Sequence, residues 1–552
     1  MKPFSHNYFL GYINEVTPQF VKIHFPSSSL LSKFYHEGVN YAGGNVGNFV
    51  VIEGEEFGFL ARINEINLPD SERKEINEKA IQHDATNFHP SGKAELLLSF
   101  NVFDPKETKK TVSKHPSIGA KVYACSDEQI EQYVKEFGKK DNDQENAFAA
   151  IGKLTSNEAI CNVSLNALFG RHCAVVGTTG GGKSWTVAKL IESITENTDN
   201  KIILIDATGE YSKLECESII LGGNSYFDYK YLTNSDFCFL FQENSPNTVA
   251  ALCEAIQSLK LVALKVPNFD GIKSGKNAEA INKLVRDNVH RFKECEFDIS
   301  KLSDQIKNEA VQLNRNGNYE ENGFKLGYCS HLIARANLLL QNDTIKNALG
   351  IEKGQEQTID VINKIESFID PQQNQHNILR IGFEKLSYDF AIREIVVDFI
   401  ASNLLKKSRK GVFVDKPIIL FIDEAHQFLN KRINADDNST FYLQNIDLIA
   451  KECRKYGLFL CLATQMPRDI PIGTLSQMGT FIVHRLINEQ DKRAIESAAS
   501  SANKNALSFL PILGEGEALL VGVDFPMPLL IKMDRPTKEP QSNTPKLKRK
   551  IK

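Results

Sequence analysis

Along residues 1–130, apolar positions fall in short runs that alternate with polar ones and are separated by turn-forming residues. The runs are YFLGYINEV, QFVKIHF, GNFVVIE, FGFLARINEI and AELLLSFNVF. A period of two is typical of strands that bury one face, so this succession predicts a small β-barrel or sandwich. Gly43, Gly44 and Gly47 suit a tight turn or a close backbone approach. Such a domain could bind a ligand or cover a ring surface, and its composition favours the structural role.

The pattern changes after residues 131–150, a polar stretch that contains KKDNDQEN and is expected to be a linker. From residue 151 to 535, continuous apolar runs predict buried strands, several of them parallel, in an α/β core. The expected strands are Cys173–Val176, Ile202–Ile205, NILRIGF, PIILFI, GLFLCLATQ and FIVHRLIN, followed by a hairpin-like pair, EALLVGV and PLLIKM, at about 515–535.

Residues of about 245–375 instead repeat apolar positions every three or four residues, as in NTVAALCEAIQSL and HLIARANLLL. This spacing predicts helices, and hence a helical subdomain inserted in the α/β core. His290 and His331 are expected to be surface or packing residues there. The tail 536–552 ends KLKRKIK and is expected to be disordered; its basic end could touch nucleic acid, but a solvated tail explains it more simply.

The stretch VVGTTGGGKS at Val175–Ser184 satisfies the pattern GxxxxGK[ST] between a predicted strand and a predicted helix. Its glycines let backbone N–H groups point at phosphate oxygens, Lys183 supplies a positive charge, and the Ser184 hydroxyl can bind Mg²⁺. The motif therefore predicts a nucleoside triphosphate site. The expected binding residues are Gly177, Thr178, Thr179, Gly180, Gly181, Gly182, Lys183, Ser184 and Trp185.

A second acidic motif, Asp423-Glu424, ends the predicted strand PIILFI. There Asp423 can hold Mg²⁺ and Glu424 can polarise an attacking water as a general base. The pair is weak evidence alone and strong beside a phosphate loop, because both motifs serve one nucleotide–Mg²⁺ complex.

Other strand ends carry polar residues with two open interpretations. Asp206, Glu210 and Tyr211 follow one strand, where Asp206 either orients water or Mg²⁺, or caps a turn. Gln465 ends another strand, where it either senses the γ-phosphate or makes an ordinary strand-end hydrogen bond.

The composition is that of a globular protein, with 42% hydrophobic and 24% charged residues among 552. No run of about 18 apolar residues occurs and the start, MKPFSHNY, lacks a signal-peptide pattern, so no membrane span is expected. Ten cysteines without metal-like spacing suggest a reducing, cytoplasmic location. The net charge of −4 argues against a protein that coats nucleic acid uniformly, but leaves room for a local basic channel.

Several motifs in order resemble the HerA-like hexameric DNA translocases, relatives of FtsK among the RecA-like P-loop ATPases. They are RHCAVVGTTGGGKS, DATGEY, IILFIDEAH and AKECRKYGLFLCLATQMP, and the first 130 residues resemble that family's N-terminal β-barrel. The sequence has Ala207 and Thr208 where proline and histidine are common in the family, and it departs from the family pattern at Cys453, where glycine is usual. It also departs at Met466, where arginine is usual. The second departure puts in doubt any role for a cation at that turn.

The resemblance implies that Lys183 and Ser184 bind phosphate and Mg²⁺, that Asp423 and Glu424 coordinate and activate, and that Gln465 senses the γ-phosphate. Arg454 and Arg485 become candidates for the arginine that one subunit supplies to its neighbour's nucleotide; either could equally be a surface residue. The closing strands resemble the family's C-terminal brace. Lys431 and Arg432 follow the acidic strand in a polar loop, which either faces a DNA-binding pore or is simply solvated.

The resemblance implies an ATP- and Mg²⁺-dependent homohexamer that translocates double-stranded DNA, and no membrane partner is expected. It is expected to work with a partner effector, such as a NurA-type nuclease or a sirtuin-like NADase, in DNA end processing or antiphage defence. Two alternatives stay open at this point. One is an ATP-regulated ring that assembles and activates a partner with little translocation; the other is a secretion or conjugation ATPase.

Overall fold

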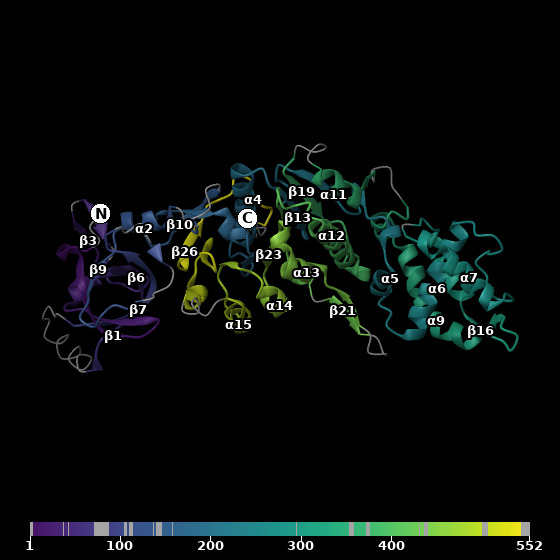
Figure 1. Ribbon diagram of the computed structural model, residues 1–552, viewed down its shortest axis with the longest axis horizontal. Helices are drawn as coiled ribbons and strands as arrows, with labels where there is room; N and C mark the ends of the chain where they lie inside the picture. The colour runs from purple at the N-terminus through teal and green to yellow at the C-terminus, as the bar shows by residue number, and fades with distance from the viewer. Residues whose placement is uncertain are drawn as a thin grey trace, which may run out of the picture. The chain divides into compact units, whose positions relative to one another are not determined.

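The computed structural model describes residues 4–36, 38–41, 43–70, 88–103, 108–109, 114–135, 137–139, 146–156, 158–293, 295–352, 358–370, 376–429, 431–434, 440–499 and 506–542. The chain divides into two compact units (Figure 1). The first comprises Met1–Asp199, Ala463–Arg468 and Ile472–Glu539, and the second comprises Asn200–Leu462, Asp469–Pro471 and Pro540–Lys552.

A closed antiparallel barrel forms the N-terminal part of the first unit. Its strands run in the order β2-β1-β9-β5-β6-β7, and β2 pairs with β7 to close it. Alternate residues such as Leu10, Val21 and Ile23 are fully buried in its core, which confirms the predicted barrel. A Cβ on Gly43 would lie 2.1 Å from the carbonyl oxygen of Leu31, so the close approach expected there is real. The strands are β1 (Phe9–Val16), β2 (Phe20–His24), β5 (Phe49–Ile52), β6 (Phe57–Asn67), β7 (Ser91–Asn101) and β9 (Lys121–Ala124), with β8 (Thr108–Lys109) added beside β7 and β3 (Phe34–His36) paired with β4 (Val39–Tyr41).

The polar stretch after the barrel is partly helical. Helix α2 (Asp127–Val134) starts at Ser126, whose hydroxyl accepts a hydrogen bond from the N–H of Gln129 at 3.2 Å. Tyr133 and Val134 are buried. The expected linker at 131–150 therefore overlaps a packed helix, because an N-cap and a few apolar residues suffice to seat a short helix.

The rest of the first unit contributes a mixed sheet in the order β11-β10-β26-β25-β24-β12. Strand β12 (Cys173–Val176) is parallel to β24 (Thr480–Val483), and β24, β25 (Glu517–Gly522) and β26 (Leu529–Met533) are successively antiparallel. The predicted C-terminal strand pair is thus present. The remaining elements are β10 (Phe148–Leu154), β11 (Ile160–Ser164), α3 (Leu165–Phe169), α4 (Lys183–Asn197), α14 (Ile472–Leu475) and α15 (Glu489–Ala498).

The second unit holds a parallel set of strands in the order β23-β20-β13-β19-β14. Every residue of β20 is buried, as the continuous apolar run predicts. The strands are β13 (Lys201–Asp206), β14 (Glu217–Ile220), β19 (Ile378–Gly382), β20 (Ile418–Ile422) and β23 (Leu458–Thr464), with α12 (Ile392–Arg409) and α13 (Asn445–Glu452) beside them. The predicted fold class, an α/β P-loop core with a barrel and inserted helices, is confirmed.

The inserted helices gather at one end of the second unit, where Figure 1 shows α6, α7 and α9 together. Their core includes Leu261, Phe269 and Ile281, while His290 and His331 are exposed as expected. Helices begin already at α5, ahead of residue 245. The elements are α5 (Asn234–Phe241), α6 (Pro246–Ala263), α7 (Ala278–Asn288), α8 (Leu302–Asn308), α9 (Gly323–Gln341), α10 (Asp343–Ala348) and α11 (Val361–Ile369), with the pairs β15 (Ser225–Tyr226)–β18 (Ile359–Asp360) and β16 (Val311–Leu313)–β17 (Tyr319–Glu321).

Two segments differ from their sequence-based expectation. Lys431 and Arg432, expected in a loop, lie in β21 (Lys431–Asn434), which pairs with β22 (Thr440–Leu443) as a hairpin; their side chains, and so their predicted contact with DNA, lie outside what the structure describes. Residues 536–542 are ordered rather than free, because Thr537 donates from its N–H and its hydroxyl to the Glu192 carboxylate, both at 2.8 Å. The basic end of the tail lies outside the described residues.

None of the helices in the described ranges combines the length and the apolar character needed to cross a membrane.

Candidate nucleotide-binding site

The phosphate loop joins β12 to α4 in the first unit. The N–H of Gly177 donates at 3.3 Å to the carbonyl of Thr464, a residue of the same unit, and this bond fixes the start of the loop. Gly180 and Gly182 have φ of 75° and 108°, a region that residues with a Cβ rarely adopt. Gly182 is also the N-cap of α4. The loop therefore leads directly into a helix N-terminus, which is an arrangement suited to binding phosphate.

The charged and hydroxyl side chains follow at once. Lys183 is 5% exposed, and Ser184 beside it is half-buried. Both stand in the first turn of α4, where the positive end of the helix dipole favours an anion. The nine expected residues, 177–185, form the loop after β12 and the first turn of α4.

His484 packs against this loop, and it was not identified from the sequence. Its Nδ1 lies 2.9 Å from the carbonyl oxygen of Glu517, and its Nε2 lies 2.8 Å from Oγ1 of Thr186. A carbonyl can only accept, so Nδ1 carries the proton and Nε2 accepts from the threonine hydroxyl. The ring is fully buried, and this burial lowers its pKa to about 4.

The same histidine explains the first glycine of the motif. A Cβ on Gly177 would stand 2.6 Å from the Cβ of His484, well inside van der Waals contact. Gly177 is thus required by packing as well as by its place in the loop. The only signal in the sequence was a histidine directly after the strand FIV, which is too common a pattern to be recognised alone.

Gln465 lies against the loop. The hydroxyl of Thr179 donates to its Oε1 at 2.5 Å, and both residues belong to the first unit. The glutamine amide is therefore held where it touches the phosphate loop. Its role in sensing the γ-phosphate stays a prediction.

Asp423 and Glu424 follow β20 in the second unit and are 1% and 4% exposed. The N–H of Asp423 donates to the carbonyl of Ile205 at 3.0 Å, which continues the pairing of β20 with β13. Glu424 has φ 47° and ψ 46°, a left-handed conformation that is strained for a residue with a Cβ and is common at functional sites. Its Oε2 lies 3.3 Å from Nδ1 of His426. The turn thus holds the carboxylate in a fixed direction beside a titratable ring.

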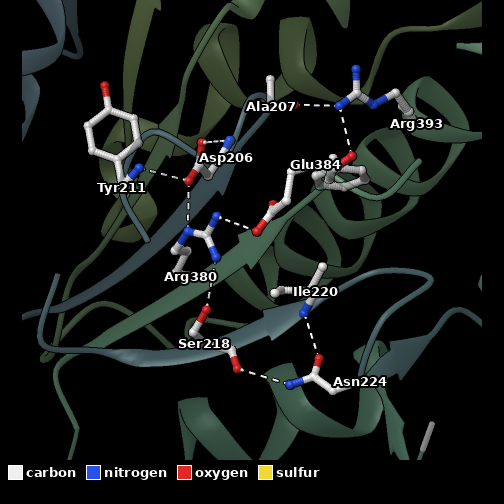
Figure 2. Close-up of polar contacts among 11 residues, drawn as sticks. Asp206, Ala207, Tyr211, Ser218, Ile220, Asn224, Arg380, Glu384 and Arg393 are labelled. Carbon is white, nitrogen blue, oxygen red and sulfur yellow. Dashed lines mark hydrogen bonds and ion pairs between the residues drawn. The ribbon is translucent and has the colours of Figure 1, made fainter. Parts of the chain in front are cut away.

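Asp206 anchors its own turn. Its carboxylate accepts from the N–H groups of Gly209 at 2.8 Å and Tyr211 at 3.1 Å, and from Nε of Arg380 at 2.7 Å (Figure 2). Arg380 is 1% exposed and also donates to Ser218 at 3.0 Å. These contacts favour the turn-capping interpretation of Asp206 over a role in orienting water or Mg²⁺.

Arg380 draws a second carboxylate into the same cluster. It donates to Glu384 at 2.8 Å. Burial alone would lower its pKa, but the ion pairs with Asp206 and Glu384 hold that pKa above its ordinary value. The adjacent Arg393 donates to the carbonyls of Ala207 and Phe383 (Figure 2). Neither arginine was singled out from the sequence, because a buried charge among the apolar residues of a strand (Arg380) or a helix (Arg393) is recognisable only once its partner is known.

The two candidate trans arginines are both exposed. Arg454 lies in the short helix Cys453–Tyr456 of the second unit and Arg485 follows β24 in the first. Neither side chain forms an ion pair with another described residue. The role of either arginine in trans stays a prediction.

Trp185, the single tryptophan of the chain, follows Ser184 on α4. The guanidinium carbon of Arg535 lies 5.2 Å from the centre of its ring, a cation–π contact. The C-terminal segment thereby reaches the edge of the loop, and the indole provides a spectroscopic probe there.

The described residues contain no group of three or more His, Cys, Asp or Glu side chains that could hold a metal ion by themselves. What they contain is a GxxxxGKS loop between a buried parallel strand and a helix, and an acidic pair that ends a second buried parallel strand. These features define a P-loop ATPase.

Comparison with known families places the chain more narrowly. Residues 149–381 match the family described as "Helicase HerA, central domain", and residues 390–536 match "Helicase HerA-like C-terminal". The chain belongs to the HerA family.

Named relatives align over most of their length. The chain is 22% identical over 516 residues to the DNA double-strand break repair helicase HerA of Pyrococcus furiosus, covering 88% of this chain and 87% of that one. It is 26% identical over 405 residues to the protein of the same name from Sulfurisphaera tokodaii, covering 70% and 69%, and 27% identical over 390 residues to a probable helicase of Methanocaldococcus jannaschii, covering 68% of each.

Solved structures with partial similarity include VirB4 of Thermoanaerobacter pseudethanolicus, with a TM-score of 0.45 and 16% identity over 70% of this chain and 96% of that one. The plasmid coupling protein TrwB with the ATP analogue ADPNP gives a TM-score of 0.44 and 13% identity over 76% and 95%.

Proposed function

We propose that the protein is an ATP-driven motor that moves double-stranded DNA through a ring of six identical subunits. The phosphate loop, with its helix N-terminus, Lys183 and Ser184, is the observation that carries the ATP site. The relatives named as DNA double-strand break repair helicases support DNA as the substrate. Contacts to DNA would be mainly to phosphates, hence insensitive to sequence and sensitive to salt.

In this proposal Lys183 and Ser184 act on the phosphates and the metal ion of the nucleotide, and Asp423 and Glu424 act on the ion and the attacking water. A serine hydroxyl and a carboxylate are the oxygen ligands that Mg²⁺ accepts, so Ser184 and Asp423 would hold the ion. Bound Mg²⁺ would neutralise charge on the phosphates. Glu424 would take the proton of the attacking water, and Arg454 or Arg485 would reach the nucleotide of the next subunit.

The effector chemistry would come from a partner protein, such as a nuclease or an NADase, in DNA end processing or antiphage defence. A second candidate is an ATP-regulated ring that activates such a partner with little translocation. The closed barrel supports this alternative, since it adds an outer surface on which a partner would dock.

The test uses the fluorescence of Trp185 to follow ATP binding and phosphate release to follow turnover. We expect Lys183→Ala to lose tight binding, and Glu424→Gln to bind ATP but to turn over about 10²–10⁴-fold more slowly, as for loss of a general base. Glu196→Gln, an exposed change on α4, is the control. Normal turnover by Glu424→Gln would remove Glu424 from the mechanism.

The ring and the motor are tested separately. The native mass of Glu424→Gln with ATP should equal that of six chains, and mixing it with Arg454→Ala or Arg485→Ala should restore some activity through mixed interfaces. Displacement of a third strand from duplex DNA reports translocation. Full ATPase activity without displacement would favour the platform.

A further inference from the structure

A cavity of about 570 Å³ lies in the second unit, lined by α12, α6, α11, the short helix Tyr229–Tyr231 with the two residues that follow it, and the chain that follows Arg291. Its volume is within the range of small-molecule sites, roughly 300–1,000 Å³. None of its lining residues belongs to the phosphate loop or to the acidic turn after β20.

The lining is strongly basic. Glu366 is the single acidic residue among the lining residues, which include six lysines from four separate segments of the chain. The formal charge of the walls is therefore well above zero, and six ammonium groups around one concavity repel each other unless an anion lies among them. The lysines are Lys230, Lys260, Lys293, Lys406, Lys407 and Lys410.

Helix α12 supplies Lys406 and Lys407, and its C-cap residue is Lys410. Phe399, Asn403, Lys406 and Lys410 are spaced by four, three and four residues, so they share one face of the helix. That face lines the cavity. Lys406 and Lys410 are thus directed toward a concave site, whereas Arg409 in the same part of the helix pairs with Glu452 instead.

Some of these charges are already neutralised and some are not. Lys230 pairs with Asp228 at 3.0 Å and Lys407 with Glu366 at 3.3 Å. Lys406 and Lys410 are exposed and form no ion pair within 4.0 Å with any residue the structure describes. The C-terminal end of the α12 dipole attracts them, but that effect is worth only a fraction of a charge.

Lys260 stands deeper in the wall. Its Nζ donates to the carbonyl of Phe292 at 3.0 Å, and burial lowers its pKa. An anion in the cavity would reverse this shift, because an opposite charge nearby favours the protonated amine. The site therefore has capacity for negative charge that its own residues do not fill.

One wall is aromatic. The rings of Tyr231 and Phe399 lie 5.7 Å apart at 32°, and both line the cavity beside the lysines. A flat ring system can stack on such a surface while its phosphates face the ammonium groups.

We propose that this cavity binds a small anion that carries a chain of phosphates, either a nucleoside polyphosphate or an inorganic polyphosphate. Lys406 and Lys410 bind the phosphate chain, and Tyr231 and Phe399 receive the base where one is present. Duplex DNA fits less well, because it presents its phosphates on a convex surface whereas these lysines line a concavity. This site is separate from the proposed ATPase site.

The test is calorimetric titration of inorganic tripolyphosphate into full-length Lys183→Ala, so that the phosphate loop contributes little. We expect binding there, and a weakening of about 100-fold when Lys406→Glu and Lys410→Glu are added, since each charged hydrogen bond contributes about tenfold or more. The matched control adds Lys283→Glu and Lys416→Glu, two exposed lysines of the second unit that do not line the cavity, and should bind as Lys183→Ala does. A parallel titration with ATP distinguishes the sources: tighter binding than tripolyphosphate indicates a nucleotide, and equal binding indicates a phosphate chain alone.

Equal affinity of the cavity variant and the control variant for tripolyphosphate would overturn the proposal. A second outcome would also overturn it: neither tripolyphosphate nor ATP binds Lys183→Ala, and the added cavity substitutions weaken binding of duplex DNA. That outcome would make this surface a DNA contact. If the glutamate variant melts earlier than its parent, Lys406→Gln with Lys410→Gln removes the same charges without adding new ones, and the same comparison applies. Failure of the proposed motor function would leave these outcomes unchanged, because the parent already lacks Lys183.

Discussion

Replacement of His484 by asparagine should change how the stability of the first unit depends on pH. His484 is fully buried, with both ring nitrogens occupied by Thr186 and Glu517. Its pKa in the folded protein is lowered to about 4 by burial, whereas an unfolded histidine titrates near 6.5. Between these two values the unfolded chain binds a proton that the folded chain does not, so stability falls as the pH falls through this window.

The magnitude follows from linkage. At pH 7 both states are almost neutral at this position, and at pH 5 the unfolded histidine is protonated while the folded one, with a pKa of about 4, is mostly neutral. The free energy of unfolding should therefore drop by about 2 kcal/mol between pH 7 and pH 5 on account of this side chain. Asparagine has no proton to bind in this range. The free energy of unfolding of the wild type should therefore exceed that of His484→Asn by about 2 kcal/mol less at pH 5 than at pH 7.

Urea denaturation followed by Trp185 fluorescence measures this difference, because the single tryptophan lies in the first unit. His115→Asn, an exposed histidine of the same unit, gives the background, within about 0.5 kcal/mol. Taking the difference between variants removes the pH dependence that carboxylates contribute equally to both proteins. A stability difference between wild type and His484→Asn that is the same at pH 7 and pH 5 would refute the assignment of a buried, neutral ring.

Two further predictions concern the second unit. Arg380→Met should lower the stability of this unit by about 3–5 kcal/mol in thermal melting, because it leaves the Asp206 carboxylate buried and unpaired. Glu384→Gln, at the partly exposed end of the same cluster, should lower that stability by less than about 1 kcal/mol. Equal losses in the two variants would contradict the role of the buried pair. Burial raises the pKa of Asp398 to about 6, so its protonated form stabilises the fold at low pH and that contribution is lost as the pH rises through about 6. Asp398→Asn should then gain about 2 kcal/mol relative to wild type between pH 4 and pH 7 in denaturation measurements, and a constant difference would show that Asp398 is not protonated in the fold.

The fold could be predicted where the apolar pattern was strong. The runs Cys173–Val176 and Ile202–Ile205 lie within strands β12 and β13 with the expected burial, since a continuous apolar run at this length has few alternatives to a buried strand. Strand β9 was missed, because four residues, Lys121–Ala124, are too short to show alternation. It nonetheless pairs with both β1 and β5 and so completes the barrel.

The site was predicted only where a motif is contiguous. The phosphate loop and the pair Asp423-Glu424 are each local patterns, and the structure places each at the end of a buried strand. His484 and Arg380 act through residues far away in sequence, Thr186 at a separation of 298 and Asp206 at 174. A periodicity argument examines a window of a few turns, so it does not detect partners at such distances.

The conformation of the phosphate loop therefore depends on the far end of the chain. The N–H of Gly516 donates to the carbonyl of Gly181 at 3.2 Å, and the adjacent Glu517 accepts from His484. Both residues lie at the start of β25, and β25 pairs with β24 and β26. The matched motif supplies the atoms that face phosphate, but backbone and side-chain hydrogen bonds to residues beyond 460, among them Thr464, Arg485 and Gly516, fix their direction. A chain that kept GTTGGGKS and lost this C-terminal sheet would keep the loop's sequence without the contacts that preorganise it, and preorganised donors are what make such a loop bind phosphate tightly.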